Sequence, residues 1–209
     1  MDTVTDDLRS DILSGRFEPG QRLLEVHLAD DYRCGRAAIR AALVALTAEG
    51  LVAREANRGA TVRRITVAEA VQITEARAAL ESLIAGQAAR NATAADRREL
   101  RGIITDMRAA VKKPNARGYS ELNGVLHRRL REMSGHTIAA ELVSNLRDRA
   151  AHHQYRLAVM PGRPEESLGQ HEAIVDAVVR GDEQAAAEAM RDHLQSVIDV
   201  LNRWGDATS

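Results

Sequence analysis

The chain has 209 residues, a net charge of −1, 44% apolar and only 2% aromatic residues, and a single cysteine, Cys34. This composition is typical of a globular protein with one or two domains, and it excludes an internal disulfide framework and a cysteine-rich zinc site. No apolar run approaches the roughly 20 residues that cross a bilayer, and the acidic N-terminus lacks the basic and apolar regions of a signal peptide. We therefore expect a cytoplasmic protein with no membrane partner.

The charges are distributed unevenly along the first part of the chain. Residues 1–32 contain three Arg against eight Asp or Glu, whereas residues 33–64 contain seven Arg against two Glu. Binding to phosphates depends on the local field rather than on net charge, so a basic segment in a nearly neutral protein favours a nucleic-acid partner.

Hydrophobic spacing predicts three helices near the N-terminus, at about 3–14, 25–31 and 36–49. In the third, Ile39, Leu43 and Leu46 share one face, and Arg40 points away from that face. Two short strands are predicted at 51–56 and 60–65. Asn57-Arg58-Gly59 joins them as the tip of a hairpin, where Gly allows the positive φ of a tight turn.

From residue 66 onward the pattern predicts helices alone, at about 67–90, 94–112, 118–134, 138–159, 165–180 and 183–204. Thr66–Glu69 and, more weakly, Thr93–Asp96 have the spacing of a capping box at a helix start. We expect a mostly α protein with a winged helix-turn-helix domain at 1–65 and an all-α domain at 66–209.

The order of helix, turn, Arg-bearing helix and hairpin indicates DNA binding. Arg36 and Arg40 lie one turn apart and can donate paired hydrogen bonds to guanine in the major groove. Arg58 and Gly59 form the wing tip. Four further arginines suit phosphate contacts: Arg33, Arg54, Arg63 and Arg64. The alternative is a solvated Arg-rich face on a winged helix that binds protein.

Several segments of the head resemble the GntR family of transcription regulators. They are Leu13–Leu23, Leu28-Ala29, Ile39–Leu43, Leu46–Val52 and Asn57–Ala60. The resemblance implies a winged-helix domain that reads an operator, with both recognition-helix arginines kept. The chain departs from the family where a turn Gly has become Arg33, where Ser and Thr have become Gly35 and Ala37, and where Glu has become Ala41. The resemblance therefore implies lost hydroxyl contacts to phosphate and a larger role for Arg33.

Three histidines lie beside apolar stripes on three predicted helices: His127, His171 and His193. Asn123 shares a helix face with His127 because the two residues are four apart. Imidazole nitrogens suit Zn, Ni, Fe, Co or Mn, and an amide oxygen can complete the set. Each histidine alone could equally be a hydrogen-bonded core residue.

The second part of the chain resembles the FCD effector domain of the FadR branch of GntR regulators, an all-α antiparallel bundle. Matching segments are Glu75–Glu81, Leu122–Leu130, Gly169–Ile174 and Met190–Leu194. The resemblance implies a divalent metal such as Zn, Ni or Mn on Asn123, His127, His171 and His193, with Asn123 in place of the usual Asp. It also implies a small organic acid on the metal and on Arg77. The alternative for Arg77 is a surface ion pair with Glu81, four residues away.

We expect a homodimer that reads an inverted repeat, since the operator mirrors the two-fold axis of the protein, with effector binding coupled to operator binding. Two alternatives remain at this point. One is a metal-dependent enzyme that uses the three-His site, although no acidic residue is tied to it by spacing as a general base. The other is a dimeric DNA-binding module without an effector.

Overall fold

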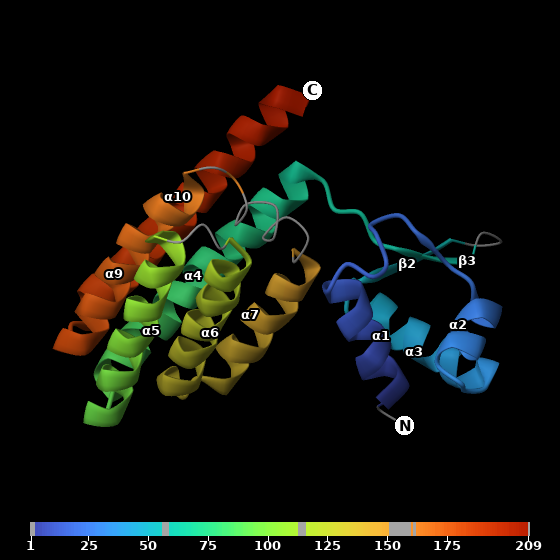
Figure 1. Cartoon of the computed structure of the whole chain (residues 1–209), viewed down its shortest axis with the longest axis horizontal. Coiled ribbons are helices and arrows are strands. Elements are labelled where there is room, and N and C mark those ends of the chain that lie inside the picture. The colour runs from blue at the N-terminus through green and yellow to red at the C-terminus, as the bar shows by residue number, and fades with distance from the viewer. Residues whose placement is uncertain (1–2, 56–58, 113–115, 151–159, 161, 209) are drawn as a thin grey trace. The chain divides into compact units, whose positions relative to one another are not determined.

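A computed structural model describes residues 3–55, 59–112, 116–150, 160 and 162–208. The chain divides into two compact units (Figure 1). Each unit has a hydrophobic core of its own. The first unit contains the residues up to Thr66 together with the end of one helix from Arg147, and the second contains the remaining helices. The predicted fold class, mostly α with a small N-terminal sheet, is confirmed.

The first unit contains α1 (Thr3–Leu13), α2 (Glu25–Asp31) and α3 (Arg36–Ala48), close to the predicted ranges. Ile39, Leu43 and Leu46 of α3 are buried, as predicted, and Ala42 joins them. They pack with Leu8 and Leu28 from the other two helices. Because these apolar residues face inward, the opposite face of α3 is left to Arg36 and Arg40, which are exposed.

The sheet of this unit has three antiparallel strands in the order β1-β3-β2: β1 (Arg22–Leu23), β2 (Val52–Glu55) and β3 (Gly59–Val62). Val52 pairs with Val62 and Glu55 with Gly59, so β2 and β3 form the predicted hairpin. Gly59 has a φ of 83°, which favours glycine. The rest of the predicted tip, including Arg58, lies outside the described residues. Sequence reasoning missed β1, whose two residues are too few for an alternating pattern.

The turn before α3 contains an unusual residue conformation. Arg33 has a φ of 49°, and it is the only residue other than glycine with a positive φ in the described ranges. A side chain in this left-handed region costs roughly 1–2 kcal/mol. The position where the family has Gly therefore keeps the conformation of a glycine although it now holds an arginine.

The second unit contains α4 (Val67–Asn91), α5 (Ala94–Lys112), α6 (Ala116–Ser134), α7 (Thr137–Arg149) as far as Leu146, α9 (Arg163–Arg180) and α10 (Glu183–Thr208). Five of the six predicted helices agree with these bounds within a few residues. The helix predicted at 138–159 was too long, because α7 ends at Arg149 and Ala150 lies in a turn. The remainder of that prediction, 151–159, lies outside the described residues. Within the described ranges no strand follows β3.

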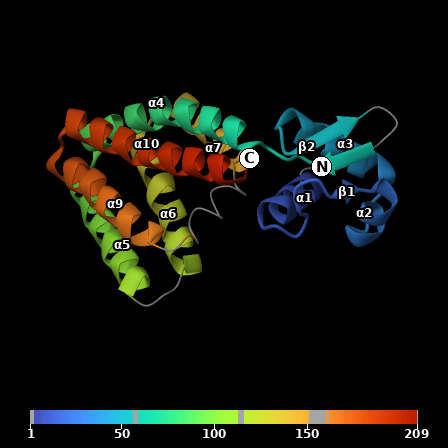
Figure 2. The ribbon, with the colours of Figure 1, turned by 90° about the horizontal axis from the view of Figure 1, so that it is seen from above.

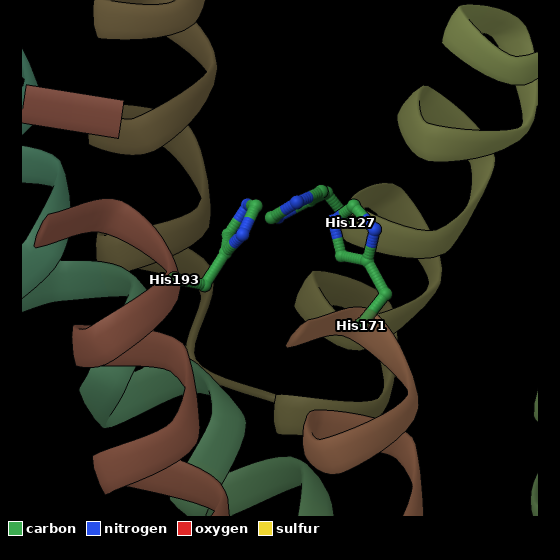
Figure 3. A group of neighbouring side chains, drawn as sticks. All are labelled: His127, His171 and His193. Atoms are coloured by element: carbon green, nitrogen blue, oxygen red, sulfur yellow. The ribbon is translucent and has the colours of Figure 1, made fainter. Parts of the chain in front are cut away.

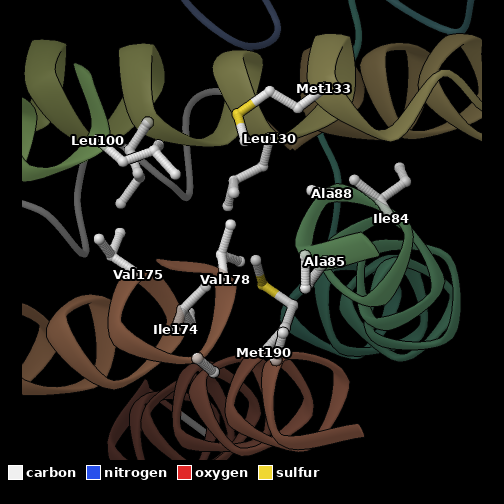
Figure 4. Packing of buried hydrophobic residues seen from close by; sticks show 14 of the residues in the cluster. Ile84, Ala85, Ala88, Leu100, Leu130, Met133, Ile174, Val175, Val178 and Met190 are labelled. Carbon is white, nitrogen blue, oxygen red and sulfur yellow. The ribbon is translucent and has the colours of Figure 1, made fainter. Parts of the chain in front are cut away.

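Helices α4 and α10 run side by side through the second unit (Figure 2). Small residues permit the close approach: a Cβ added at Gly86 would lie 3.2 Å from the backbone oxygen of Glu183. Ala85 and Ala88 of α4 are fully buried. Larger side chains such as Leu130 and Met190 fill the remaining interior between α4, α6, α9 and α10 (Figure 4). Their packing fixes the relative positions of the helices that carry the three histidines.

The capping box predicted at the start of α5 is confirmed. The hydroxyl and the backbone N–H of Thr93 donate to the Asp96 carboxylate at 2.7 and 2.9 Å, and the Asp96 N–H donates back to the Thr93 hydroxyl at 3.2 Å. These bonds satisfy amides that have no partner within the helix. Among the described residues, no helix is long and apolar enough to cross a membrane.

Candidate functional site

Three histidines meet in the interior of the helical unit. His127 of α6, His171 of α9 and His193 of α10 are 2%, 0% and 5% exposed. One nitrogen from each ring lies within 4.8 Å of the others, and Figure 3 shows the rings turned toward one another. The ring centroids are 5.5 Å apart for His127–His171, 5.6 Å for His127–His193 and 4.4 Å for His171–His193. The structure thus brings the predicted histidines together.

Each of the three rings has a hydrogen-bond partner at Nδ1. His127 Nδ1 donates to Oε2 of Glu81 at 2.7 Å, and His193 Nδ1 donates to Oε1 of Gln170 at 2.9 Å. His171 Nδ1 lies 3.2 Å from the Tyr119 hydroxyl. Such partners fix the tautomer and the orientation of metal-ligating histidines. Nε2 is therefore the nitrogen that each ring would offer to a metal ion.

Glu81 is shared between His127 and Arg77. The Nε and Nη2 atoms of Arg77 lie 2.8 and 2.7 Å from Glu81 Oε1, while Oε2 accepts from His127. The Arg77 and Glu81 side chains are 4% and 2% exposed. The predicted pair between Arg77 and Glu81 exists, but the expectation that it lies on the surface was wrong. One oxygen of this carboxyl group thus contacts the guanidinium, and the other orients the imidazole.

Burial lowers the pKa of His193 well below its usual value of 6.5, and the neighbouring His171 and His127 lower it further. The ring is therefore neutral near pH 7, which is the protonation state that binds a metal. Burial also raises the pKa of Tyr119 to about 12, so this hydroxyl stays protonated beside His171.

Asn123 supplies an independent test of whether these residues fit a metal. It lies one turn before His127 on α6, and its Oδ1 atom is buried with no hydrogen-bond partner in the described part of the chain. An unsatisfied buried oxygen of this kind costs about 1–3 kcal/mol. Three imidazoles and an amide oxygen form a donor set that suits a divalent transition metal. The residues therefore fit the implied ion.

The candidate DNA surface is the outer face of α3. Arg36 is exposed at the start of the helix, and Arg40 is 63% exposed one turn later. The Nε atom of Arg40 donates to Oε2 of Glu25 on α2 at 2.7 Å. This contact holds one nitrogen of the guanidinium, and it limits the directions in which the guanidinium can point.

The other predicted DNA contacts differ in their surroundings. Arg33 and Arg54 are exposed, as phosphate contacts require. Arg64, in contrast, donates from Nε to the carbonyl of Pro19 at 2.9 Å, so it holds the turn before β1. Arg58 lies outside the described residues.

Sequence reasoning missed the residues that orient the site. Gln170 directly precedes His171 in the chain, yet its side chain bonds His193 on another helix. Glu25 and Tyr119 likewise reach partners that no sequence spacing relates to them. Only Glu81 had a signal, since it lies four residues after Arg77 and its charge on an apolar helix face requires a partner.

A winged helix-turn-helix unit followed by a helical unit with a buried three-His centre defines a class of protein: transcription regulators with a separate sensing domain. Two family models match the chain. The GntR model, "Bacterial regulatory proteins, gntR family", covers residues 1–62, and the FCD domain model covers residues 72–196. The chain therefore belongs to the GntR family of bacterial regulators and carries a C-terminal FCD domain.

Individual relatives agree with this assignment. The HTH-type transcriptional repressor RspR of Escherichia coli is 27% identical over 94% of this chain and 86% of its own length. An uncharacterized HTH-type regulator from an unstable DNA locus of Streptomyces ambofaciens is 32% identical over 94% of this chain and 82% of its own length. Both similarities extend over the head and the helical unit together.

Solved structures show the same fold. E. coli McbR/YncC superposes with a TM-score of 0.81 at 21% identity, covering 96% of each chain. A GntR regulator from Rhodococcus sp. RHA1 superposes with a TM-score of 0.74 at 22% identity, covering 95% of each chain. The protein is a transcription regulator with a DNA-binding head and an FCD effector domain, and the alternative of a metal-dependent enzyme is wrong.

Proposed function

We propose that this regulator binds an inverted-repeat operator as a homodimer, in the manner of the FadR branch, and that a small carboxylate bound in its helical domain changes operator affinity. The protein acts in the cytoplasm. Residues 1–65 bind DNA, and residues 66–209 bind the effector and dimerise. The observation that carries the proposal is the set of three buried imidazoles, each with a partner at Nδ1.

Operator reading is assigned to α3. Arg36 and Arg40 are exposed on the face opposite the buried residues and can reach base edges in one groove. Arg33 and Arg54 contact phosphates, with Arg58 and Gly59 at the wing. These backbone contacts determine affinity and its salt dependence, whereas the pair on α3 determines sequence preference.

A divalent ion is held by His127, His171 and His193 through Nε2 and by the amide oxygen of Asn123. The bound ion supplies a positive centre with a coordination position that a carboxylate can take. With a neutral amide at position 123, the site carries one negative charge less than a site with Asp. The net positive charge therefore favours an anionic effector.

Arg77 contributes a second positive group to effector binding. Its side chain is buried and held by Glu81, the same carboxylate that orients His127. An effector at this position would therefore be linked through a single carboxylate to the ring that holds the metal. Effector binding shifts the populations of two states that differ in operator affinity, and operator binding shifts effector affinity by the same factor.

The test combines metal content with operator binding. Protein purified without added metal or chelator should contain a stoichiometric divalent ion by elemental analysis, and His127→Ala should lose it. His27→Ala is the matched control, because His27 is exposed on α2 of the head. Small carboxylates should change the affinity of the loaded wild-type protein for a duplex selected from a random pool. Absence of metal from both the wild type and the control would overturn the proposal.

A further inference from the structure

Arg163 begins α9 and is 7% exposed, although it is charged. Its Nη1 atom donates to the Ser196 hydroxyl at 2.7 Å and lies 3.1 Å from Oε2 of Glu166. Its Nη2 atom is buried and has no hydrogen-bond partner within the described ranges. A buried guanidinium with an unsatisfied N–H group is energetically unfavourable, and an anionic oxygen would satisfy it.

Arg163 belongs to the same helix face as one of the histidines. Arg163, Ser167 and His171 follow one another at four-residue spacing on α9, and all three are buried. On the facing helix, Ser196 follows His193 by three residues, which is a rise of about 4.5 Å along α10. The hydrogen bond from Arg163 to Ser196 therefore places this guanidinium about one helical turn from the three-His centre.

Arg77 and Arg163, the buried arginines in the described part of the domain, differ in how their charge is balanced. Arg77 makes two contacts with Glu81, which is itself 2% exposed, so a desolvated carboxylate offsets its charge. Arg163 is close to Glu166, whose side chain is 52% exposed and therefore solvated. The charge of Arg163 is thus less fully balanced than that of Arg77. Arg163 also has an N–H group, at Nη2, that can still donate a hydrogen bond.

We propose that Arg163 binds a second acidic group of the effector, so that the effector class is a short dicarboxylate rather than a monocarboxylic acid. The inference rests on the proposed carboxylate site at the three-His centre. One carboxylate of the ligand binds at that centre, and the other accepts from Nη2 of Arg163 one helical turn away. Two carboxylates separated by a short carbon chain match this spacing.

The experiment titrates two matched series into the metal-loaded full-length protein by calorimetry: saturated monocarboxylates and dicarboxylates of equal carbon number, such as butyrate and succinate. The wild type should bind the best dicarboxylate on the order of 10–100-fold more tightly than its matched monocarboxylate, the range expected for a charge-assisted pair. Arg163→Gln should remove this preference while the metal content stays unchanged. Arg180→Gln, at the exposed end of the same helix, should keep it.

Arg163→Lys provides a second variant if Arg163→Gln does not fold. Lysine keeps the charge but not the forked donor geometry, so the preference should fall without disappearing. Equal binding of both series by the wild type, or an unchanged preference in a folded Arg163 variant, would overturn the dicarboxylate inference and leave the proposed function standing. Metal-loaded wild type that binds neither series would overturn the carboxylate effector itself.

Discussion

Arg40 and Glu25 form an ion pair between the recognition helix and the helix before it, with 2.7 Å from Nε to Oε2. The Arg40 side chain is 63% exposed, so the pair stands at the surface where a duplex would bind. An exposed pair adds little to stability. Its effect is on the orientation of the guanidinium, because a long flexible side chain loses rotamer freedom when one nitrogen is already bound.

Loss of Arg40 should weaken sequence-specific binding. A bidentate arginine–guanine contact contributes about 1–3 kcal/mol of discrimination, so Arg40→Ala should lose roughly 5–150-fold in affinity for the selected duplex. Circular dichroism should be unchanged, because the side chain is 63% exposed. Unchanged affinity in a gel-shift titration would refute the assignment of α3 as the reading helix.

Glu25→Gln should separate affinity from specificity. Removing a carboxylate beside the DNA surface strengthens attraction to phosphates, while the released guanidinium samples more directions. We expect binding to random duplex to strengthen and the ratio of specific to non-specific affinity to fall, most clearly at low salt. Competition titrations at two salt concentrations measure both quantities. An unchanged ratio would show that Glu25 does not orient Arg40.

Arg33→Gly should stabilise the head and weaken DNA binding at once. Glycine removes the left-handed strain of roughly 1–2 kcal/mol but adds freedom to the unfolded chain, so a net gain of about 1 kcal/mol or less is expected. Urea unfolding measures it. Arg33→Ala is the control, because alanine removes the charge and keeps the strain. A similar gain from both variants would mean that charge, not φ, is the cause.

Asn123→Asp should increase metal affinity by at least about tenfold, because a carboxylate replaces a neutral amide oxygen as ligand. Asn123→Ala should reduce it by removing the ligand altogether. Competition with a chromogenic chelator gives the dissociation constants. Equal affinities for the wild type and both variants would exclude residue 123 from the coordination sphere.

The capping box at α5 should show a defined pH dependence. Hydrogen bonds from Thr93 lower the pKa of Asp96, with Arg129 adding to the effect. A lowered pKa means that the stabilisation is present above the usual value of 3.8 and is lost as the pH falls through the lowered value. Thr93→Ala should cost about 1 kcal/mol at neutral pH. The destabilisation by Asp96→Asn, measured by urea unfolding, should shrink as the pH falls below 3.8.

Local sequence signals predicted most of the fold. Apolar spacing and glycines at helix ends fixed α1 to α6 and the last two helices, because those signals act within a few residues. The end of α7 was missed since no glycine or proline marks Arg149, and the periodic pattern continues past it. Strand β1 depends on pairing with β3, a contact that is distant in sequence.

The residues of the candidate site also fall into two groups, those that the sequence predicted and those that it did not. The three histidines could be named because each has an apolar stripe beside it and a family motif around it. Their partners could not, since Gln170 and Tyr119 act across helices, where the packing of side chains decides which polar groups meet. Arg163 had no signal in the sequence, because an arginine at the start of a helix is ordinarily solvated.

One oxygen of the Glu81 carboxylate pairs with the charge of Arg77, and the other orients the imidazole ring of His127. Replacing it would leave Arg77 as an unpaired cation in the protein interior, and breaking a buried pair in this way costs about 3–5 kcal/mol. A genetic screen for variants that no longer respond to the effector would therefore recover few substitutions at position 81. Such variants would be unstable and would be degraded before their response could be measured. Under the proposed function, the stability of the domain and its response to an effector depend on the same residue, Glu81.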